Sequence, residues 1–431
     1  MLGGGTFTTQ NKVLPGAYIN FVSAARVSSS LTERGIAAMP FVLDWGPAGE
    51  VFEVTADTVQ AESKRLFGYD YADEKMRDIR ELFRHARTVF CYRLNEGVKA
   101  ANDYAMARYG GVRGNSLKTV IQANADEESK FDVSIYLGNE RIDTQTVASA
   151  AELQANDFVT WKAEASLKAT AGTALTGGTN GEAITGTQYQ AFLTAIEPYS
   201  FHVLGCPSSE SAVISLFTAF TKRMRDDCGV KFQTVVYRSA ADYEGVISVE
   251  NQAQEADAGL VYWVTGAAAG CAVNACLSNM AYDGEYTPVV DHTQAQLEAG
   301  IKAGKFLFHK VGDEVRVLLD INTYISFTEE KNSDFSDNQT VRVLDQIAND
   351  IALLFNTKYY GLIPNDESGR VSLWNDIVKH HQDLESLRAI ENFDPEDVVV
   401  SAGETRRAVK VSDAVTPVSA MSTLYMTVVV E

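Results

Sequence analysis

The sequence is short of basic charge. It has 37 Lys and Arg residues against 57 Asp and Glu residues, so its formal net charge at pH 7 is -20. Nucleic-acid binding requires clustered Lys and Arg side chains that neutralise phosphates. An acidic surface also repels an anionic membrane. The composition therefore argues against direct nucleic-acid binding.

Long apolar runs are absent as well. No stretch of 18 apolar residues is present that could span a bilayer. The N-terminal residues do not combine a basic start, an apolar run and a small-residue cleavage site, which together mark a secretory signal. We expect no membrane insertion, and we expect synthesis and residence in a cytoplasm.

The cysteines are few and form no metal-binding pattern. None of the five belongs to a C-x-x-C pair. Cys271 and Cys276 are five residues apart, a spacing that does not place two thiolates side by side on a helix, and no His lies near them in the sequence. We expect no metal site. The cysteines are predicted to be reduced, buried core residues; they are Cys91, Cys206, Cys228, Cys271 and Cys276.

Motifs of catalysis and cofactor binding are also missing. There is no G-x-S-x-G nucleophile elbow and no phosphate loop of the Walker type. Acidic residues near 329–337 are interpreted as solvated or helix-capping, with Asp337 or Asn338 as the cap. His381 falls on the apolar face of a predicted helix, which is typical of a core or interface histidine. No catalytic residue and no cofactor is predicted.

The first two thirds of the chain alternate between strands and helices. Strand-like runs at 36–43 and 88–93 flank a helical pattern at 76–86, and the same rhythm returns after residue 200. Segment 95–186 interrupts it with alternating strands. We therefore predict an α/β domain formed by 23–94 and 187–284, with an inserted β domain at 95–186. The Gly- and Thr-rich stretch 169–181 is expected to be a flexible connector.

Residues 256–280 favour a long helix, although their first half, 260–264, could equally form a strand. Small residues dominate 266–276, which allows close packing against a sheet or another helix. The following segment, 285–417, is predicted to be a separate α+β domain. It contains a helix at 294–303, a hairpin around Gly312 and two amphipathic helices at 340–355 and 371–390 that lie on a sheet.

Both tips of the chain are apolar and strand-like. Residues 13–22 follow a Gly- and Thr-rich start, and residues 422–430 are almost wholly β-branched, aromatic or aliphatic. Apolar strands at exposed tips pair with other chains unless something covers them. We predict an N-terminal linker arm at 1–22 and a C-terminal linker strand at 418–431 that join neighbouring subunits. The alternative is that both arms close a sheet within their own subunit. The candidate inter-subunit residues are Val13, Tyr18, Ile19, Phe21, Leu424, Tyr425, Met426, Val428, Val429 and Val430.

Several short motifs, taken in order, resemble the contractile phage tail sheath proteins of Gram-positive phages and phage-tail-like particles. No single motif is diagnostic, but their order spans nearly the whole chain. They are VLPGAYIN at 13–20, RGN at 113–115, FDV at 131–133, DTQTV at 143–147, NDFV at 156–159, LTGG at 175–178 and VLLDINT at 317–323.

The resemblance implies a fold. Sheath proteins of this type have a subtilisin-like α/β domain without a working triad, an inserted β-sandwich, an α+β C-terminal domain and extended terminal arms. The arms add strands to a neighbour's C-terminal sheet, so that the polymer contracts without losing its connections.

The resemblance also implies a function and partners. The subunit would polymerise as stacked rings around an inner tail tube and contract to drive that tube through a bacterial envelope. Its partners would be copies of itself, the tube protein, and baseplate and tail terminator proteins. It would belong to a virion tail or a tailocin, assembled in the host bacterial cytoplasm.

A sheath must hold its tube weakly enough to release it, so the contact should be polar and sensitive to salt. Lys358, Lys379 and Arg388 lie beside the predicted amphipathic helices and are candidates for the tube-facing surface. A second function also stays open, that of a cytoplasmic α/β enzyme of the subtilisin-like or hydrolase-like class. The missing catalytic motifs favour the sheath, which we expect not to be an enzyme.

Overall fold

A computed structural model describes residues 3–5, 16–18 and 31–430 of the chain. These residues divide into two compact units. The larger unit comprises 33–347 and 417–430, and the smaller unit comprises 348–416 with the described part of 1–32. The boundary between the two falls within helix α7 (Asn338–Leu354). The predicted multidomain α/β architecture is confirmed.

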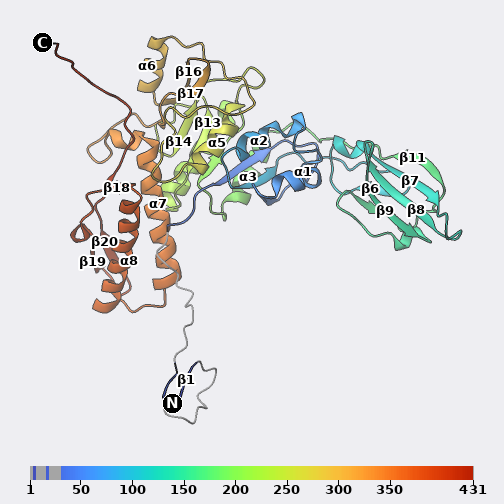
Figure 1. Cartoon of the computed structure of the whole chain (residues 1–431), viewed down its shortest axis with the longest axis horizontal. Helices are drawn as coiled ribbons and strands as arrows, with labels where there is room; N and C mark the ends of the chain where they lie inside the picture. Colours follow the sequence, from blue (N-terminus) through green and yellow to red (C-terminus); the bar gives the residue numbers. More distant parts are fainter. Residues whose placement is uncertain (1–2, 6–15, 19–30, 431) are drawn as a thin grey trace. The chain divides into compact units, whose positions relative to one another are not determined.

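The larger unit is built on a seven-stranded sheet (Figure 1). All neighbouring strands are parallel except for β4, which pairs antiparallel with β5 at one edge. Parallel strands need crossover connections, and helices supply most of them here. In order across the sheet the strands are β15 (Lys305–Phe306), β14 (Val246–Val249), β13 (Gln233–Tyr237), β12 (Val203–Gly205), β3 (Ile36–Phe41), β5 (Thr88–Arg93) and β4 (Val51–Thr55).

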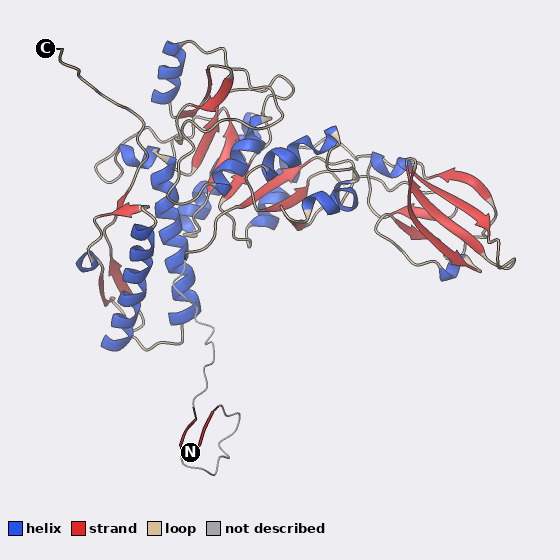
Figure 2. Ribbon diagram, in the orientation of Figure 1, coloured by secondary structure: helices blue, strands red, loops and turns tan. Residues whose placement is uncertain are grey.

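Strand residues alternate between two apolar cores, one on each face of this sheet. In β3, Ala37 and Met39 belong to one core and Ala38 to the other, and all three are fully buried. Helices cover both faces, as is usual for a parallel sheet. Figure 2 shows these helices and strands. The first core takes α1 (Val59–Phe67), α2 (Arg77–Phe83) and α5 (Leu260–Gly270), and the second takes α3 (Gly186–Ile196) and α4 (Ser211–Lys222).

Helix α5 is shorter than the sequence predicts. It ends at Gly270, and Cys271 is already extended, so the helix predicted to reach residue 280 is wrong in its second half. The alternative strand at 260–264 is also wrong, because this segment is helical. Close packing is confirmed: a Cβ atom on Gly266 would lie 2.3 Å from the carbonyl oxygen of Leu82. Only glycine permits this approach between α5 and α2.

The inserted segment forms a β-sandwich. A four-stranded antiparallel sheet and a two-stranded sheet share one core that includes Leu117, Ile135 and Val159. The predicted connector at 169–181 is wrong in part, because β11 pairs with β7 and Leu175 is fully buried. The larger sheet runs β11 (Thr170–Ala174), β7 (Leu117–Ala123), β8 (Phe131–Leu137), β9 (Glu140–Val147), and the smaller joins β6 (Ala105–Ala107) to β10 (Val159–Trp161).

The α/β sheet continues past residue 284, where the sequence suggests a domain boundary, because β15 extends it by pairing with β14. Helix α6 (Gln294–Lys302) precedes β15. The predicted hairpin at Gly312 is confirmed as β16 (Phe308–Val311) and β17 (Glu314–Val317). The core of the sheet thus draws on residues from both sides of that boundary.

The cysteines behave in part as predicted. Cys91, Cys206 and Cys271 are buried, and burial raises the pKa of the Cys206 thiol to about 12, as expected for an unreactive core cysteine. Cys228 is exposed and Cys276 is only half-buried, so the prediction is wrong for Cys228 and holds only in part for Cys276. Cys228 follows the last turn after α4, where the chain reaches the surface.

A buried carboxylate, Asp320, holds the beginning of α7 in the larger unit. It accepts hydrogen bonds from Arg342 Nη2 at 3.1 Å, from Asn338 Nδ2 at 2.9 Å and from the Leu277 backbone N–H at 3.0 Å. The side chains of Asp320 and Arg342 are both fully buried. One group of polar contacts therefore connects three segments that are distant in the sequence.

A second buried pair holds the same part of α7. Arg225 donates to both carboxylate oxygens of Asp345, at 2.6 and 2.8 Å. Burial alone would lower the pKa of Arg225, but the Asp345 carboxylate raises it above its ordinary value. The bidentate pair keeps Arg225 charged in the interior.

The smaller unit packs the end of α7 and α8 (Glu367–Ser386) against a two-stranded sheet. Its core includes Leu354, Leu373, Ile377 and Val398. Both predicted amphipathic helices are confirmed, with ends shifted by a few residues. The strands that follow α8 are β18 (Ile390–Glu391), β19 (Val399–Ala402), β20 (Val409–Ser412) and β21 (Thr416–Pro417).

Replacing Arg342 with Met should destabilise the larger unit strongly. The substitution leaves the Asp320 carboxylate buried without its counter-charge, which costs about 3–5 kcal/mol of unfolding free energy. Chemical denaturation followed through the buried Trp263 would measure the loss.

Arg316→Met is the matched control, because it removes a partly exposed pair with Glu314 and should cost at most about 1 kcal/mol. Similar losses from both variants would contradict a special role for Asp320.

Candidate functional site

The C-terminal tail, defined as residues 418–430, is the most unusual surface of the chain. It contains no helix or strand in the structure, and Figure 2 draws it as a loop. Its large apolar side chains are 69–103% exposed; they are Met421, Leu424, Tyr425, Met426, Val428, Val429 and Val430. Burying one such side chain fully is worth about 1.5–3 kcal/mol. A contiguous apolar segment in water is typical of a binding surface.

The tail has two different faces when it is extended. Side chains of a strand point alternately to opposite sides. Leu424, Met426, Val428 and Val430 would share one wholly apolar face, and the opposite face would mix Tyr425 and Val429 with threonines. This alternation suits a strand that covers an apolar surface with one side and meets solvent with the other.

The root of the tail is tied to the first turn of α7. Ser419 Oγ donates to Asp337 Oδ2 at 3.1 Å, and the Ala420 backbone N–H donates to Gln339 Oε1 at 3.0 Å. Asp337 also accepts from the Thr340 backbone N–H, so its predicted role as a helix cap is confirmed. Burial raises the pKa of the Asp337 carboxyl. The tail therefore leaves the larger unit from a defined point.

A hairpin in the smaller unit has edges available for a further strand. β19 and β20 pair antiparallel, with Val399 opposite Ser412 and Ala402 opposite Val409. In the part of the chain that the structure describes, no third strand joins them. Val399 and Val411 are exposed. Unpaired N–H and C=O groups along such edges are a template for another chain.

An apolar groove lies beside β20. It has a volume of about 450 Å³ and is open to solvent. Its lining comes from the end of α7, from α8 and from Val409 and Val411 of β20. The groove residues on the helices are Ala348, Ile351, Ala352, Phe355, Asn356, Leu373 and Ile377. A strand that paired with β20 would place one of its faces on this surface.

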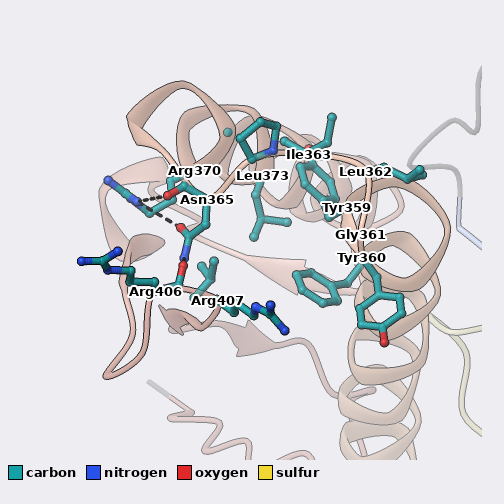
Figure 3. Close-up of a pocket in the computed structure, with 14 residues that line it drawn as sticks. Tyr359, Tyr360, Gly361, Leu362, Ile363, Asn365, Arg370, Leu373, Arg406 and Arg407 are labelled. Atoms are coloured by element: carbon teal, nitrogen blue, oxygen red, sulfur yellow. Dashed lines mark hydrogen bonds between the residues drawn. The ribbon is translucent and has the colours of Figure 1, made fainter.

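A second cavity of about 630 Å³ adjoins the groove, and the two share Phe355, Leu373 and Val409. We call it the arginine pocket. Figure 3 shows Arg370 and Arg406 with Asn365 at one side of it and Tyr359 and Tyr360 at the other. The remaining lining residues are Gly361, Leu362, Ile363, Pro364, Gly369 and Arg407.

The predicted interface residues have different outcomes. Val13, Ile19 and Phe21 lie outside the described residues. Tyr18 is part of the short strand β2 (Gly16–Tyr18), which pairs parallel with β1 (Gly3–Gly5). The structure brings together the six predicted residues of the C-terminal tail on one exposed segment.

The three candidate tube-facing residues occupy the smaller unit. Lys358 donates to Asp376 Oδ2 at 2.5 Å and is half-buried, which makes it less available for a partner. Lys379 is exposed on α8. Arg388 is exposed just after α8, in the left-handed backbone region with φ of 60°.

The groove and the arginine pocket are candidate surfaces that the sequence reasoning missed. One sequence pattern could have predicted the strand beside the groove. Val409 and Val411 alternate with polar residues after Gly403, which is typical of a hairpin strand. No motif marks Arg370, Arg406 and Arg407 as neighbours, because α8 and the β19–β20 turn meet only in the folded unit.

His380 and His381 are buried core residues. The prediction for His381 is confirmed: it is fully buried and lies 2.7 Å from Asp413, measured from Nε2 to Oδ2. His380 lies 3.0 Å from Asp350, measured in the same way. Each imidazole thus has a carboxylate partner within the smaller unit.

The described residues offer no metal site and no membrane-spanning helix. Within them, no group of three His, Cys, Asp or Glu side chains is arranged to hold a metal ion. The described helices include none that is long and apolar enough to cross a bilayer. The surfaces that stand out are therefore the tail, the hairpin with its groove, and the arginine pocket.

Family models for phage tail sheath proteins match almost the whole chain. The central domain matches residues 182–323 and the C-terminal domain matches 330–431. The β-sandwich domain matches 95–180, which contains the observed sandwich. The N-terminal region of domain III of tail sheath protein Gp18 matches 34–94.

Individual relatives agree with these matches. The phage-like element PBSX protein XkdK of Bacillus subtilis is 35% identical over 467 residues, which cover 99% of each chain. The crystal structure of a sheath tail protein from Desulfitobacterium hafniense is 38% identical with a TM-score of 0.82, and covers 94% of this chain and 97% of its own. A sheath tail protein from Listeria innocua is 32% identical with a TM-score of 0.80, and covers 91% and 93%. The chain therefore belongs to the phage tail sheath protein family.

Proposed function

We propose that the protein is the structural subunit of a contractile tail sheath, which polymerises around an inner tail tube and contracts to drive the tube through a bacterial envelope. The observation that carries the proposal is the exposed apolar tail at 421–430, found in the same chain as a hairpin with unpaired edges. Membership of the sheath family supports the proposal. The role is structural and not enzymatic.

Neighbouring subunits are joined by strand exchange. The tail of one subunit pairs with the β19–β20 hairpin of the next and lays its apolar face in the groove beside β20. Each main-chain hydrogen bond contributes about 0.5–1.5 kcal/mol net. Several such bonds, together with apolar burial, hold two subunits together while the bodies they connect rotate.

The N-terminal arm, residues 1–22, is the second linker, with Val13, Tyr18, Ile19 and Phe21 as its contact residues. A two-stranded hairpin has two edges, so it can accept a strand from each of two neighbours. Two links per subunit would connect copies within a ring and between rings.

The α/β layer of the larger unit is subtilisin-like in this proposal and serves as a scaffold without a working triad. The described sheet supports this reading, since it is largely parallel and has helices on both faces. The assembled particle is a virion tail or a phage-tail-like particle, put together in the host cytoplasm. Baseplate and tail terminator proteins bind its two ends.

Removing either arm should abolish polymerisation and leave a folded monomer. Deletion of 418–431 removes the donated strand, and deletion of 1–22 removes the second link, whereas the described cores lie elsewhere. Electron microscopy of the purified chains should show hollow striated tubes for the full chain and none for either deletion. Circular dichroism would check that the monomers stay folded.

Two point variants separate loss of apolar contact from a mere change of charge. Val428→Asp places a charge on the apolar face of the tail, and the matched Thr427→Asp places it on the other face. Only the Val428→Asp variant should prevent tube formation.

For the deletions, long tubes formed by both truncated chains would refute strand exchange.

The tube-facing contact is assigned to exposed basic residues of the smaller unit, Lys379 and Arg388, with Lys358 as a weaker candidate because of its pair with Asp376. Reversing Lys379 and Arg388 to Glu should weaken co-sedimentation of the sheath with its tube at low salt without preventing polymerisation. The difference from the unmodified chain should shrink at high salt, because salt screens exposed charges. Unchanged tube binding at low salt would contradict the assignment.

A further inference from the structure

The arginine pocket combines exposed apolar groups with basic charge. Tyr360 is 72% exposed and Leu362 is 68% exposed, which are large fractions for side chains of this kind. Arg406 and Arg407 are exposed, and within the described residues no carboxylate forms an ion pair with them or with Arg370. The pocket is therefore basic and apolar on a chain with a net charge of -20. Such a surface suits an apolar segment that carries carboxylates.

The chain itself displays such a segment. Residues 325–330, the acidic loop, are all exposed; they include Ile325, which is 43% exposed, and Phe327, which is 52% exposed. Glu329 and Glu330 follow after Thr328, and no ion pair binds either of them among the residues that the structure describes. Two apolar side chains and two carboxylates thus stand next to one another.

The acidic loop has a defined shape despite its exposure. The backbone N–H groups of Ile325 and Ser326 donate to Asp242 Oδ1, at 2.8 and 3.0 Å. The Phe327 ring packs edge-on against the buried Tyr324 ring, with centroids 5.7 Å apart. The Thr328 N–H donates to the Lys331 carbonyl oxygen at 2.8 Å. A loop that is already ordered loses little conformational entropy when it docks.

We infer that the acidic loop of one subunit docks in the arginine pocket of a neighbouring copy. Phe327 and Ile325 cover Tyr360 and Leu362, and the carboxylates of the loop face the arginines. The inference rests on the proposed polymerisation. It adds to strand exchange a second contact, made by side chains, that fixes how one subunit is positioned against the next. Loop and pocket are different surfaces, so the contact is heterologous, and a heterologous contact that does not close generates a helical polymer.

The charge contribution can be tested by a double reversal. Glu329→Lys with Glu330→Lys, and separately Arg406→Glu with Arg407→Glu, should each raise the critical concentration for polymerisation about tenfold, because like charges then face each other. Combining all four substitutions restores opposite charges and should return the critical concentration to within about threefold of the unmodified chain. Sedimentation of polymer from monomer measures the quantity. Arg370 is left unchanged because it holds Asn365.

Matched controls carry the same charge changes elsewhere. Lys302→Glu with Lys310→Glu alters the larger unit at exposed positions, and Glu128→Lys with Glu164→Lys alters the β-sandwich at exposed positions. In the absence of tube, neither pair should change the critical concentration by more than about threefold. An effect equal to that of the test variants would overturn the inference, since it would show a response to overall charge alone.

A photo-crosslinker locates the contact directly. p-Benzoylphenylalanine replaces Phe327 in the full chain, and equal amounts of isotopically heavy and light subunits are polymerised together. Mixed heavy–light crosslinks from residue 327 to peptides containing 359–365 or 406–409 support the inference. Intermolecular crosslinks only to other segments overturn it while leaving strand exchange intact, and a chain that forms no polymer at all overturns both. If a crosslinker placed at residue 429 labels 359–365 instead, the pocket belongs to the tail.

Discussion

The buried carboxylate of Asp320 is the interaction on which the position of helix α7, and with it the root of the exposed tail, depends. Together with Arg342, Asn338 and the Leu277 backbone it fixes the first turns of α7 in the interior of the larger unit. The same turns hold the root of the C-terminal tail through Asp337 and Gln339. Burying the Asp320–Arg342 pair is costly, and removing one partner of the buried pair is costly as well. The pair therefore favours one position of α7 over others. The tail consequently starts from a fixed point, although the structure gives residues 421–430 no hydrogen bond or strand pairing within the described chain.

In our account, unsatisfied surfaces drive the polymerisation of the subunit. The tail exposes apolar side chains that a stable monomer would normally bury, and the β19–β20 hairpin leaves strand edges unpaired beside an apolar groove. In our account each copy supplies what the next one lacks, so the free energy of burial is gained only on assembly. The arginine pocket and the acidic loop add a proposed contact between opposite charges. Such a contact offsets the repulsion between copies of a strongly acidic chain.

Local patterns predicted much of the fold. Three features could be predicted because each depends on residues close in sequence. They are the apolar spacing of α7 and α8, the Gly312 hairpin and the alternation within the sandwich. An apolar terminal strand was also predicted from composition, but residues 418–430 form no strand in the structure, and their role as a linker stays a prediction. β11 was missed because its glycine and two threonines form a strand only when β7 offers a partner. The arginine pocket was missed because it is assembled from two stretches of chain, 355–373 and 406–409, that only the fold brings together.

Strand exchange is the central claim, and the amide hydrogen exchange of residues 422–430 tests it most directly. The account predicts that these amides exchange at nearly the rate of an unfolded peptide in the monomer, since they have no partner among the described residues. In assembled tubes, exchange of alternate amides, those that face the neighbouring strand, should slow by at least about a hundredfold. Equally fast exchange in monomer and tube would contradict the account.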